Sequence, residues 1–574
     1  MVMRVLNGFR AHSAAVTLAA TAWLSVFGVA PVRAQTPAAP AQSDIRRISI
    51  DEAVALALEN NLDLQVDRIT PQIQDLTVAQ ARSGYTPVFR SNIDWNDQTQ
   101  PPASLLAGNA SQIVGNNSSY DFGFGGFNRW GGNYNLAFNN ARATTNNIFT
   151  NFNPQLASNI SASYTQPLLR NFKIDGTRQQ LLVSLKSREI ADEQLRQSIA
   201  LTARNVRNAY YDLMYTVGNL NVQRQSLELA EQSLKDNRAR VEIGTMAPID
   251  IVQAEAEVAQ REESVILAEA AIARAEDRLR ALVFNPSSPD FWRLRIEPTE
   301  QVQFRPALVD TDSAVANALQ RRTDLSQVRK QLEANDVNIR YFRNQTLPDV
   351  NASLTYFSQA IGGTSFIRDP TSGFPGTVIG QLEKSYSSTL QTMFSGDFPT
   401  WTLQMQISYP IGQANAEAAL ARSRLQDQQF RRQIQSQELQ VATQIREFGR
   451  QVTTNTKRVE ATRASRVLAE RRLEAEEKKF QAGMTTSFLV FQAQRDLNQA
   501  RNNELQALVD YVKSTVDFEA AQETPLQNTS GSQNQNTGVG NTGVGGLTGT
   551  GNLTGTGNLN GLTGTTNTPG QRQQ

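Results

Sequence analysis

The chain contains two copies of one unit. Asp51 to Leu58 is echoed from Asp312 to Leu319 in the same register. Three later helix-breaking residues keep their order in both copies: Pro87 with Pro348, Pro167 with Pro410, and Gly244 with Gly483. Chance similarity between Ala-rich helices does not account for this order. We therefore predict a first repeat over residues 48–284, a connector over 285–311 and a second repeat over 312–522.

Each copy is predicted to begin with a helix, over residues 49–84 and 311–344, that ends before Pro87 or Pro348 because proline cannot extend a helix. A strand, a long loop and a return strand follow. In the last strand Leu403, Met405 and Ile407 alternate with polar residues. One face of the strand is therefore apolar and the other is predicted to face water. We predict four strands per chain, with external loops over residues 99–155 and 358–397. The alternating stretch 134–138 is interpreted as an extension of the hairpin beyond the membrane.

The helices after the return strands have the spacing of coiled coils. Leu220, Leu227, Leu234 and Val241 lie seven residues apart, which is typical of a packed apolar seam. About 65–70 residues precede each Gly turn, so each long helix spans roughly 100 Å. The helices after residue 248 and before residue 344 are about half as long, and stacked end to end they match one long helix. We expect four parallel struts per chain, with the connector at mid-height.

Composition excludes several functions. The chain has no Cys, and its only His is His12, so histidine triads, cysteine nucleophiles and most transition-metal sites are excluded from the mature protein. We predict no enzyme activity and no cofactor or metal. The net charge of +1 argues against a nucleic-acid partner.

The two ends are predicted to lie outside the fold. Arg4 and Arg10 precede an apolar stretch and the small-residue site Val32-Arg33-Ala34, so residues 1–34 read as a signal peptide. Residues 35–47 are predicted to be a flexible lead without the Cys that a lipoprotein needs. The Gly, Thr and Asn repeats of residues 523–574 predict a disordered tail.

Four strands cannot close a barrel, and open edges in lipid leave backbone groups unsatisfied. Three chains would supply twelve strands around a wide lumen. Five aromatic residues are predicted to face lipid in a belt: Trp95, Tyr164, Tyr356, Trp401 and Tyr409.

Residues 48–522 resemble the outer-membrane efflux protein (TolC) family, and the chain resembles a non-lipidated member of it. The likeness rests on the opening helix of residues 49–64, on Gln166-Pro167-Leu168-Leu169 and on the two Gly turns. It implies a mainly α, internally duplicated protein in which a long α-helical coiled-coil barrel in the periplasm joins a trimeric 12-stranded outer-membrane β-barrel. It also implies a homotrimer in outer-membrane lipid, a periplasmic adaptor (membrane fusion) protein and an inner-membrane transporter.

The resemblance also assigns roles to residues at the turns. The implied adaptor-docking tips are Ile243, Gly244, Thr245, Ala482, Gly483 and Met484. Asp250 matches an acidic position that helps to hold the family's entrance shut. Three further gate candidates, Thr485, Leu489 and Gln492, align with a basic and two acidic positions of the family but depart from them in chemistry.

Two functional hypotheses follow. The first is a passive channel of a tripartite efflux or type I secretion system. The second is a non-channel coiled-coil scaffold or surface adhesin, which the alternating strands and the repeated Gly turns disfavour. The residues do not identify the cargo.

Overall fold

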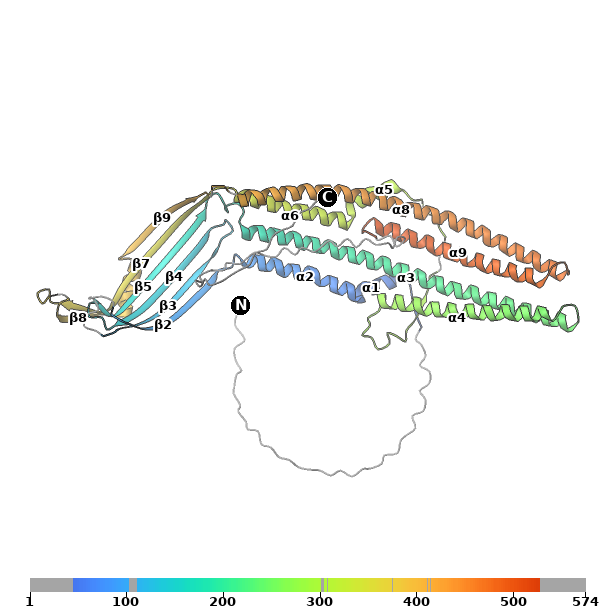
Figure 1. Ribbon diagram of the computed structural model, residues 1–574, viewed down its shortest axis with the longest axis horizontal. Coiled ribbons are helices and arrows are strands. Elements are labelled where there is room, and N and C mark those ends of the chain that lie inside the picture. The colour runs from blue at the N-terminus through green and yellow to red at the C-terminus, as the bar shows by residue number, and fades with distance from the viewer. Residues whose placement is uncertain are drawn as a thin grey trace, which may run out of the picture. The chain divides into compact units, whose positions relative to one another are not determined.

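The computed structural model describes residues 45–102, 111–300, 304–306, 308–373, 375–409, 411–412 and 414–526. These residues belong to one compact unit, Met1–Leu526. The predicted signal peptide, residues 35–44 of the lead and the tail from residue 527 lie outside the described part. The elements of the first half, shown in Figure 1, are β1 (Ile45–Ile48), α1 (Ile50–Asn60), α2 (Leu62–Ser83), β2 (Val88–Gln100), β3 (Ile113–Phe127), β4 (Asn133–Thr145), β5 (Phe152–Pro167), α3 (Gly176–Glu242) and α4 (Ile249–Val283).

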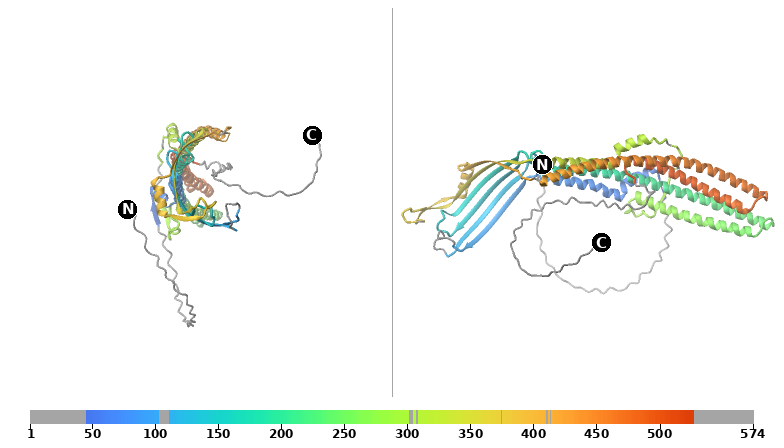
Figure 2. Two further views of the ribbon diagram at one scale, coloured as in Figure 1. Left: turned by 90° about the vertical axis from the view of Figure 1, so that its left-hand side faces the viewer. Right: turned by 45° about the horizontal axis from the view of Figure 1, so that its top comes forward.

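The second half follows the same plan, which confirms the predicted duplication. Its elements are β6 (Arg295–Pro298), α5 (Thr311–Arg321), α6 (Thr323–Gln345), β7 (Asp349–Arg368), β8 (Val378–Lys384), α7 (Tyr386–Ser395), β9 (Pro399–Ser408), α8 (Ala414–Gln481) and α9 (Ser487–Ala521). The two long helices α3 and α8 have 67 and 68 residues, so each is about 100 Å long. The helices α4 and α9 have 35 residues each. The sheet lies at one end of these helices and both Gly turns lie at the other (Figure 1 and Figure 2).

The opening helix of each copy is broken, which corrects the single helix predicted there. Asn61 has extended backbone between α1 and α2, and its side-chain oxygen caps α2 by accepting from the Leu64 amide at 3.0 Å. Its amide nitrogen donates to the Leu282 carbonyl at 3.2 Å. Arg322 takes the same place between α5 and α6. The break lets the chain change direction between the two short helices at mid-height, while the backbone groups at the helix ends stay hydrogen-bonded.

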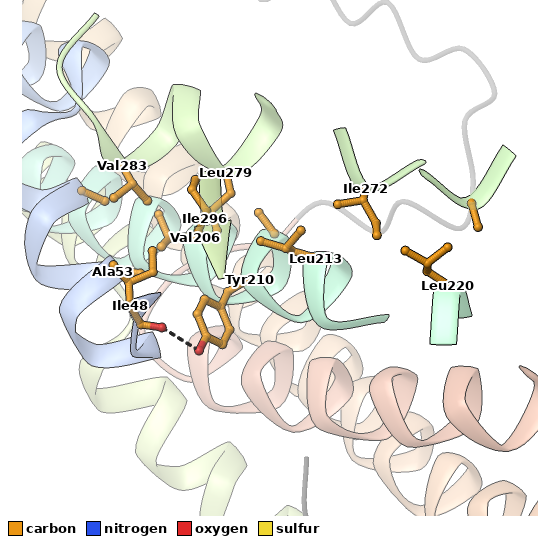
Figure 3. Packing of buried hydrophobic residues seen from close by; sticks show 13 residues of the cluster. Ile48, Ala53, Val206, Tyr210, Leu213, Leu220, Ile272, Leu279, Val283 and Ile296 are labelled. Atoms are coloured by element: carbon orange, nitrogen blue, oxygen red, sulfur yellow. Dashed lines mark hydrogen bonds between the residues drawn. The ribbon is translucent and has the colours of Figure 1, made fainter. Parts of the chain in front are cut away.

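Mid-height is also where the largest core of the first copy lies. Figure 3 shows Val206, Leu213 and Leu279 packed around Tyr210. The Tyr210 hydroxyl donates to the Ile48 carbonyl at 3.0 Å. Strand β1 pairs in parallel with β6 of the connector, so residues 45–47 are ordered rather than part of a flexible lead.

The sheet has more strands than we predicted. Its order is β2-β3-β4-β5-β7, and β9 and β8 both pair with the far side of β7. Six long strands, β2, β3, β4, β5, β7 and β9, therefore lie side by side, and the prediction of four is wrong. Residues 113–145 are β3 and β4, not an external loop, and residues 134–138 belong to β4. Their Gly and Asn content gives weak strand propensity, which pairing on both sides overrides.

The second predicted loop, residues 358–397, is also largely regular structure. Strand β7 continues to Arg368 and pairs with β8. Helix α7 then packs on β7 and β5, where the Ser358 hydroxyl donates to the Met393 carbonyl at 2.8 Å. Gly362 permits this approach because a Cβ there would meet Thr389 Oγ1 at 1.8 Å.

Within the part of the chain that the structure describes, we find no helix with the length and apolar character needed to cross a bilayer.

Candidate functional site: a two-faced sheet and paired glycine turns

The sheet has one apolar face and one polar face. Strand residues alternate between faces, and the pairing register aligns the alternation across all six long strands. The apolar face carries Phe89, Ile93, Trp95, Tyr120, Phe122, Phe124, Leu136, Phe138, Ile160, Tyr164, Leu354, Tyr356, Trp401, Leu403 and Met405. The polar face carries Arg90, Asn92, Asp94, Asn117, Ser119, Asp121, Asn139, Asn159, Ser161, Ser163, Asn351, Ser353, Thr355, Thr402, Gln404 and Gln406.

The predicted lipid-facing aromatics occupy the apolar face. Trp95, Tyr164, Tyr356 and Trp401 share it by register, and Tyr409 follows β9 directly. Trp95 and Trp401 are 76% and 67% exposed. The ring centroids of Tyr356 and Trp401 are 4.7 Å apart. Followed from strand to strand, the pairing register aligns Trp95 of β2 with Leu156 of β5. Tyr164 lies eight residues further along β5. The five residues are therefore spread over the height of the face.

The two Gly turns have the same geometry. Gly244 has a φ of +78° and Gly483 of +72°, the left-handed region that glycine adopts without a steric cost. After α3, the Thr245 amide donates to the Arg240 carbonyl at 2.8 Å. After α8, the Met484 amide donates to the Lys479 carbonyl at 2.9 Å. Both turns are Schellman motifs, in which the last free carbonyls of a helix are satisfied by the chain leaving it.

The predicted docking residues lie at these turns and expose apolar surface. Ile243 is 74% exposed and Met484 is 78% exposed. Beside them the Arg240 guanidinium lies 4.6 Å from the centroid of the Phe480 ring. The ends of α3 and α8 are thus in contact through a cation–π pair.

Asp250 makes a contact between the two copies. Its Oδ1 accepts a hydrogen bond from the Ser487 hydroxyl at 2.9 Å, so the first turns of α4 and α9 are joined. Further along, Arg495 Nη1 of α9 lies 3.8 Å from Glu257 Oε2 of α4. Glu257 is buried and also accepts from Arg261 Nε at 2.8 Å. The sequence did not predict Ser487, Glu257 or Arg495, because nothing along the chain indicates which residues of the two copies meet.

The other gate candidates do not make a comparable bridge. Thr485 is half-buried in the turn, Leu489 is 41% exposed, and Gln492 is half-buried. Leu489 stands six residues after Gly483, as Asp250 stands six after Gly244, so the acidic contact has no counterpart at that position in the second copy.

A polar cavity of about 220 Å³ lies between α3, α8 and α9, near the turns. Gln494 crosses it and donates to the Ser233 hydroxyl at 3.2 Å. Burial, together with the nearby Glu474 carboxylate, raises the pKa of Glu477 in the cavity wall. No cluster of three or more metal-ligating side chains occurs among the described residues.

A two-faced sheet carried on duplicated helical hairpins, each with one helix about 100 Å long, defines a class of outer-membrane channel components. The sequence profile of the outer membrane efflux protein family matches residues 53–283 and 314–521. The chain belongs to that family. It is an outer-membrane efflux protein with its helical part in the periplasm, and the family's channels work as trimers with adaptor and pump partners. The family assignment supports a channel rather than a scaffold or adhesin.

Solved structures agree with this assignment at the level of the fold. The chain is similar to the Campylobacter jejuni CmeC outer membrane channel, with 15% identity, a TM-score of 0.56, and 83% of this chain and 85% of that chain covered. It is similar to VceC from Vibrio cholerae, with 15% identity, a TM-score of 0.57, and 83% and 96% covered. It is also similar to the open state of MtrE from Neisseria gonorrhoeae, with 15% identity, a TM-score of 0.55, and 83% and 89% covered. No curated protein sequence matches the chain.

Proposed function

We propose that three copies of this chain form a passive conduit from the periplasm to the exterior, without chemistry of its own. The observation that carries the proposal is the sheet, which has a polar face, an apolar face and two outer strands, each with one edge that pairs with no described strand. Strands β2 and β9 are exposed along their whole length. In lipid, unpaired strand edges cost several kcal/mol for each unsatisfied backbone group, so identical subunits must complete the ring.

Purified full-length protein tests this proposal. We expect three times the chain mass in detergent and discrete conductance steps in planar bilayers. Monodisperse protein with the mass of one chain, or a trimer without conductance in any applied field, would contradict a conduit. Either result would favour the scaffold hypothesis instead.

A periplasmic adaptor is proposed to dock on the residues of the two turns, 243–245 and 482–484, and to connect the conduit to an inner-membrane transporter. Exposed Ile243 and Met484 give that surface apolar anchors, as protein interfaces commonly use. Because the chain has no Cys, Met484→Cys places one thiol at the turn. A thiol-reactive photocrosslinker on this variant should capture the adaptor in intact cells. Leu439→Cys, at a similarly exposed apolar position on α8, should not.

Efflux and type I secretion make different demands on the same conduit. A deletion strain separates them: increased drug sensitivity supports efflux, and loss of a secreted protein with unchanged drug tolerance supports secretion.

A further inference from the structure

The strands β3 and β4 are two additional strands in the wall of the sheet. We propose that the closed trimer has an eighteen-stranded barrel, six strands from each chain, in which β9 of one chain pairs with β2 of the next. The inference rests on the proposed trimeric conduit and departs from the twelve strands that the family resemblance implies.

The ladders make β3 and β4 full members of the sheet. Every residue from Val88 to Gln100 has a partner in β3. Strand β3 pairs with β4 along their common length, and β4 pairs with β5 from Asn133 to Ala143. Strand β5 has no pairing with β2, so the inserted pair separates the two strands that would otherwise be neighbours.

The inserted strands also continue both faces of the wall. Phe122 and Phe138 lie on the apolar face, and the ring of Phe122 stacks on that of Phe89 at 6.3 Å. On the polar face the Asn139 amide donates to Asn159 Oδ1 at 2.9 Å. A loop with water on both sides does not need one apolar and one polar face, whereas a strand in the wall of a membrane barrel does.

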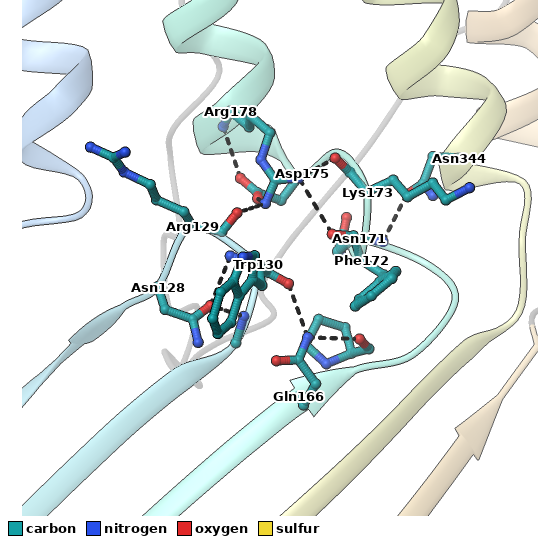
Figure 4. A network of polar contacts seen from close by, with 12 residues as sticks. Asn128, Arg129, Trp130, Gln166, Asn171, Phe172, Lys173, Asp175, Arg178 and Asn344 are labelled. Carbon is teal, nitrogen blue, oxygen red and sulfur yellow. Dashed lines mark hydrogen bonds and ion pairs between the residues drawn. The ribbon is translucent and has the colours of Figure 1, made fainter.

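The turn between β3 and β4 is fixed at the junction with the helices (Figure 4). Gln166 Nε2 donates to the Trp130 carbonyl at 2.9 Å, and Arg178 donates to the Arg129 carbonyl. Gly131 has a φ of +81°, and a Cβ there would meet the Asn171 carbonyl oxygen at 2.3 Å. The turn is therefore packed against the segment that leads from β5 into α3, at the level where other strands meet their helices.

Six strands satisfy the geometry of closure. Neighbouring strands are antiparallel from β2 through β9, so β9 runs opposite to β2. A head-to-tail joint of the two edges is then antiparallel as well, and such a joint closes into a ring when the rotation fits. The apolar side of β9, with Trp401 and Leu403, meets the apolar side of β2, with Phe89 and Ile93, without interruption.

The added strands widen the membrane part alone. Barrel diameter grows about linearly with strand number, so eighteen strands give a wall roughly 1.5 times as wide as twelve. Eighteen-stranded porins enclose an aqueous channel. The helical part keeps four struts per chain, so the added strands leave the width of the helical part unchanged.

Electron cryo-microscopy of the purified full-length trimer counts the strands. We expect eighteen, with residues 113–145 in the wall. A trimer with twelve strands and this segment outside the wall overturns the inference and leaves the proposed function standing. A chain that remains monomeric in detergent and in nanodiscs overturns the proposed function, and the inference with it.

Engineered disulfides give an independent test, since the chain has no Cys of its own. Asn139→Cys with Asn159→Cys joins β4 to β5 at directly paired positions, and oxidation should link most of the chains internally. Asn92→Cys with Asn159→Cys is the matched control, because two strands separate these positions and no link should form. Efficient linking of the control with none in the first pair would overturn the inference.

Discussion

Ser487 Oγ donates to Asp250 Oδ1 at 2.9 Å, and this bond joins the first turn of α4 to the first turn of α9. Ser487 is 4% exposed, so water competes weakly for the bond. Asp250 belongs to the first copy and Ser487 to the second. The contact therefore links the two helical hairpins of one chain at their tips, where we propose that the channel opens.

We predict that Asp250→Asn and Ser487→Ala increase opening. A hydrogen bond to a charged group contributes about 1.5–3 kcal/mol, and part of that holds the two hairpins together. The open fraction of single channels in planar bilayers should rise severalfold in both variants. Asp496→Asn is the control, because Asp496 pairs with Arg472 inside one hairpin at 2.8 Å. Equal opening in all three variants would show that the contact between hairpins has no special part in the gate.

We predict that Gly483→Ala destabilises the turn after α8. A left-handed conformation costs a residue with a Cβ about 1–2 kcal/mol, and no atom lies within 4 Å of where that Cβ would stand. The cost is therefore conformational and not steric. Hydrogen exchange of the Met484 amide, which closes the turn, should accelerate about tenfold. Gly483→Asn should cost less, since Asn tolerates this region; the same acceleration in both variants would contradict the explanation.

Sequence reasoning found the features that depend on local pattern. The repeated breakers gave the duplication, and period-two alternation placed Trp401, Leu403 and Met405 on the apolar face. The heptad spacing that contains Leu220 gave helices of the observed length. Each of these properties is determined within one element, so the residues of that element are enough to predict it.

Features that depend on pairing between distant segments were missed. Gly123 and Gly125 weaken β3 as an isolated strand, and only its partners on both sides make it one. The contact of Asp250 with Ser487 joins residues 237 positions apart. No periodicity within either helix indicates such a partner. The proposed roles of the turns and the gate remain predictions.

We predict that Arg322→Ala is strongly destabilising. Arg322 is 1% exposed, pairs with Asp324 through Nη2 and Oδ2 at 2.9 Å, and donates through Nη1 to Gln444 Oε1 at 2.9 Å. Removing one partner of a buried ion pair costs about 3–5 kcal/mol, because the other charge is left without compensation.

Its neighbour Arg321 is exposed and provides the matched control. Arg321→Ala should change the free energy of unfolding by no more than about 0.5 kcal/mol. Urea denaturation followed by helical circular dichroism measures both variants. A cost below 1 kcal/mol for Arg322→Ala would show that water and Gln437, whose Nε2 donates to Asp324 Oδ2 at 2.5 Å, satisfy Asp324 without the guanidinium.

The stability of the fold should depend on pH through Glu276. Burial raises the pKa of Glu276 above the ordinary glutamate value, although Arg295 and Arg280 act in the opposite direction. The folded state therefore holds this proton more tightly than the unfolded state. Its contribution to stability is fully present below the ordinary glutamate pKa and is lost as the pH rises through the raised pKa. Acidification from neutral pH should stabilise the wild type relative to Glu276→Gln, which cannot titrate.

Glu189 should behave in the opposite way and provides the control for sign. A hydrogen bond from Lys330 lowers the pKa of Glu189, so its contribution is present above the ordinary glutamate pKa and is lost as the pH falls through the lowered pKa. Glu189→Gln should be less stable than the wild type at neutral pH, and the difference should shrink on acidification. Denaturation midpoints measured at several pH values between neutral and mildly acidic should therefore converge for Glu189→Gln and shift in favour of the wild type for Glu276→Gln. The same pH trend in both variants would mean that burial does not control Glu276, because only desolvation of its carboxylate gives the two residues opposite signs.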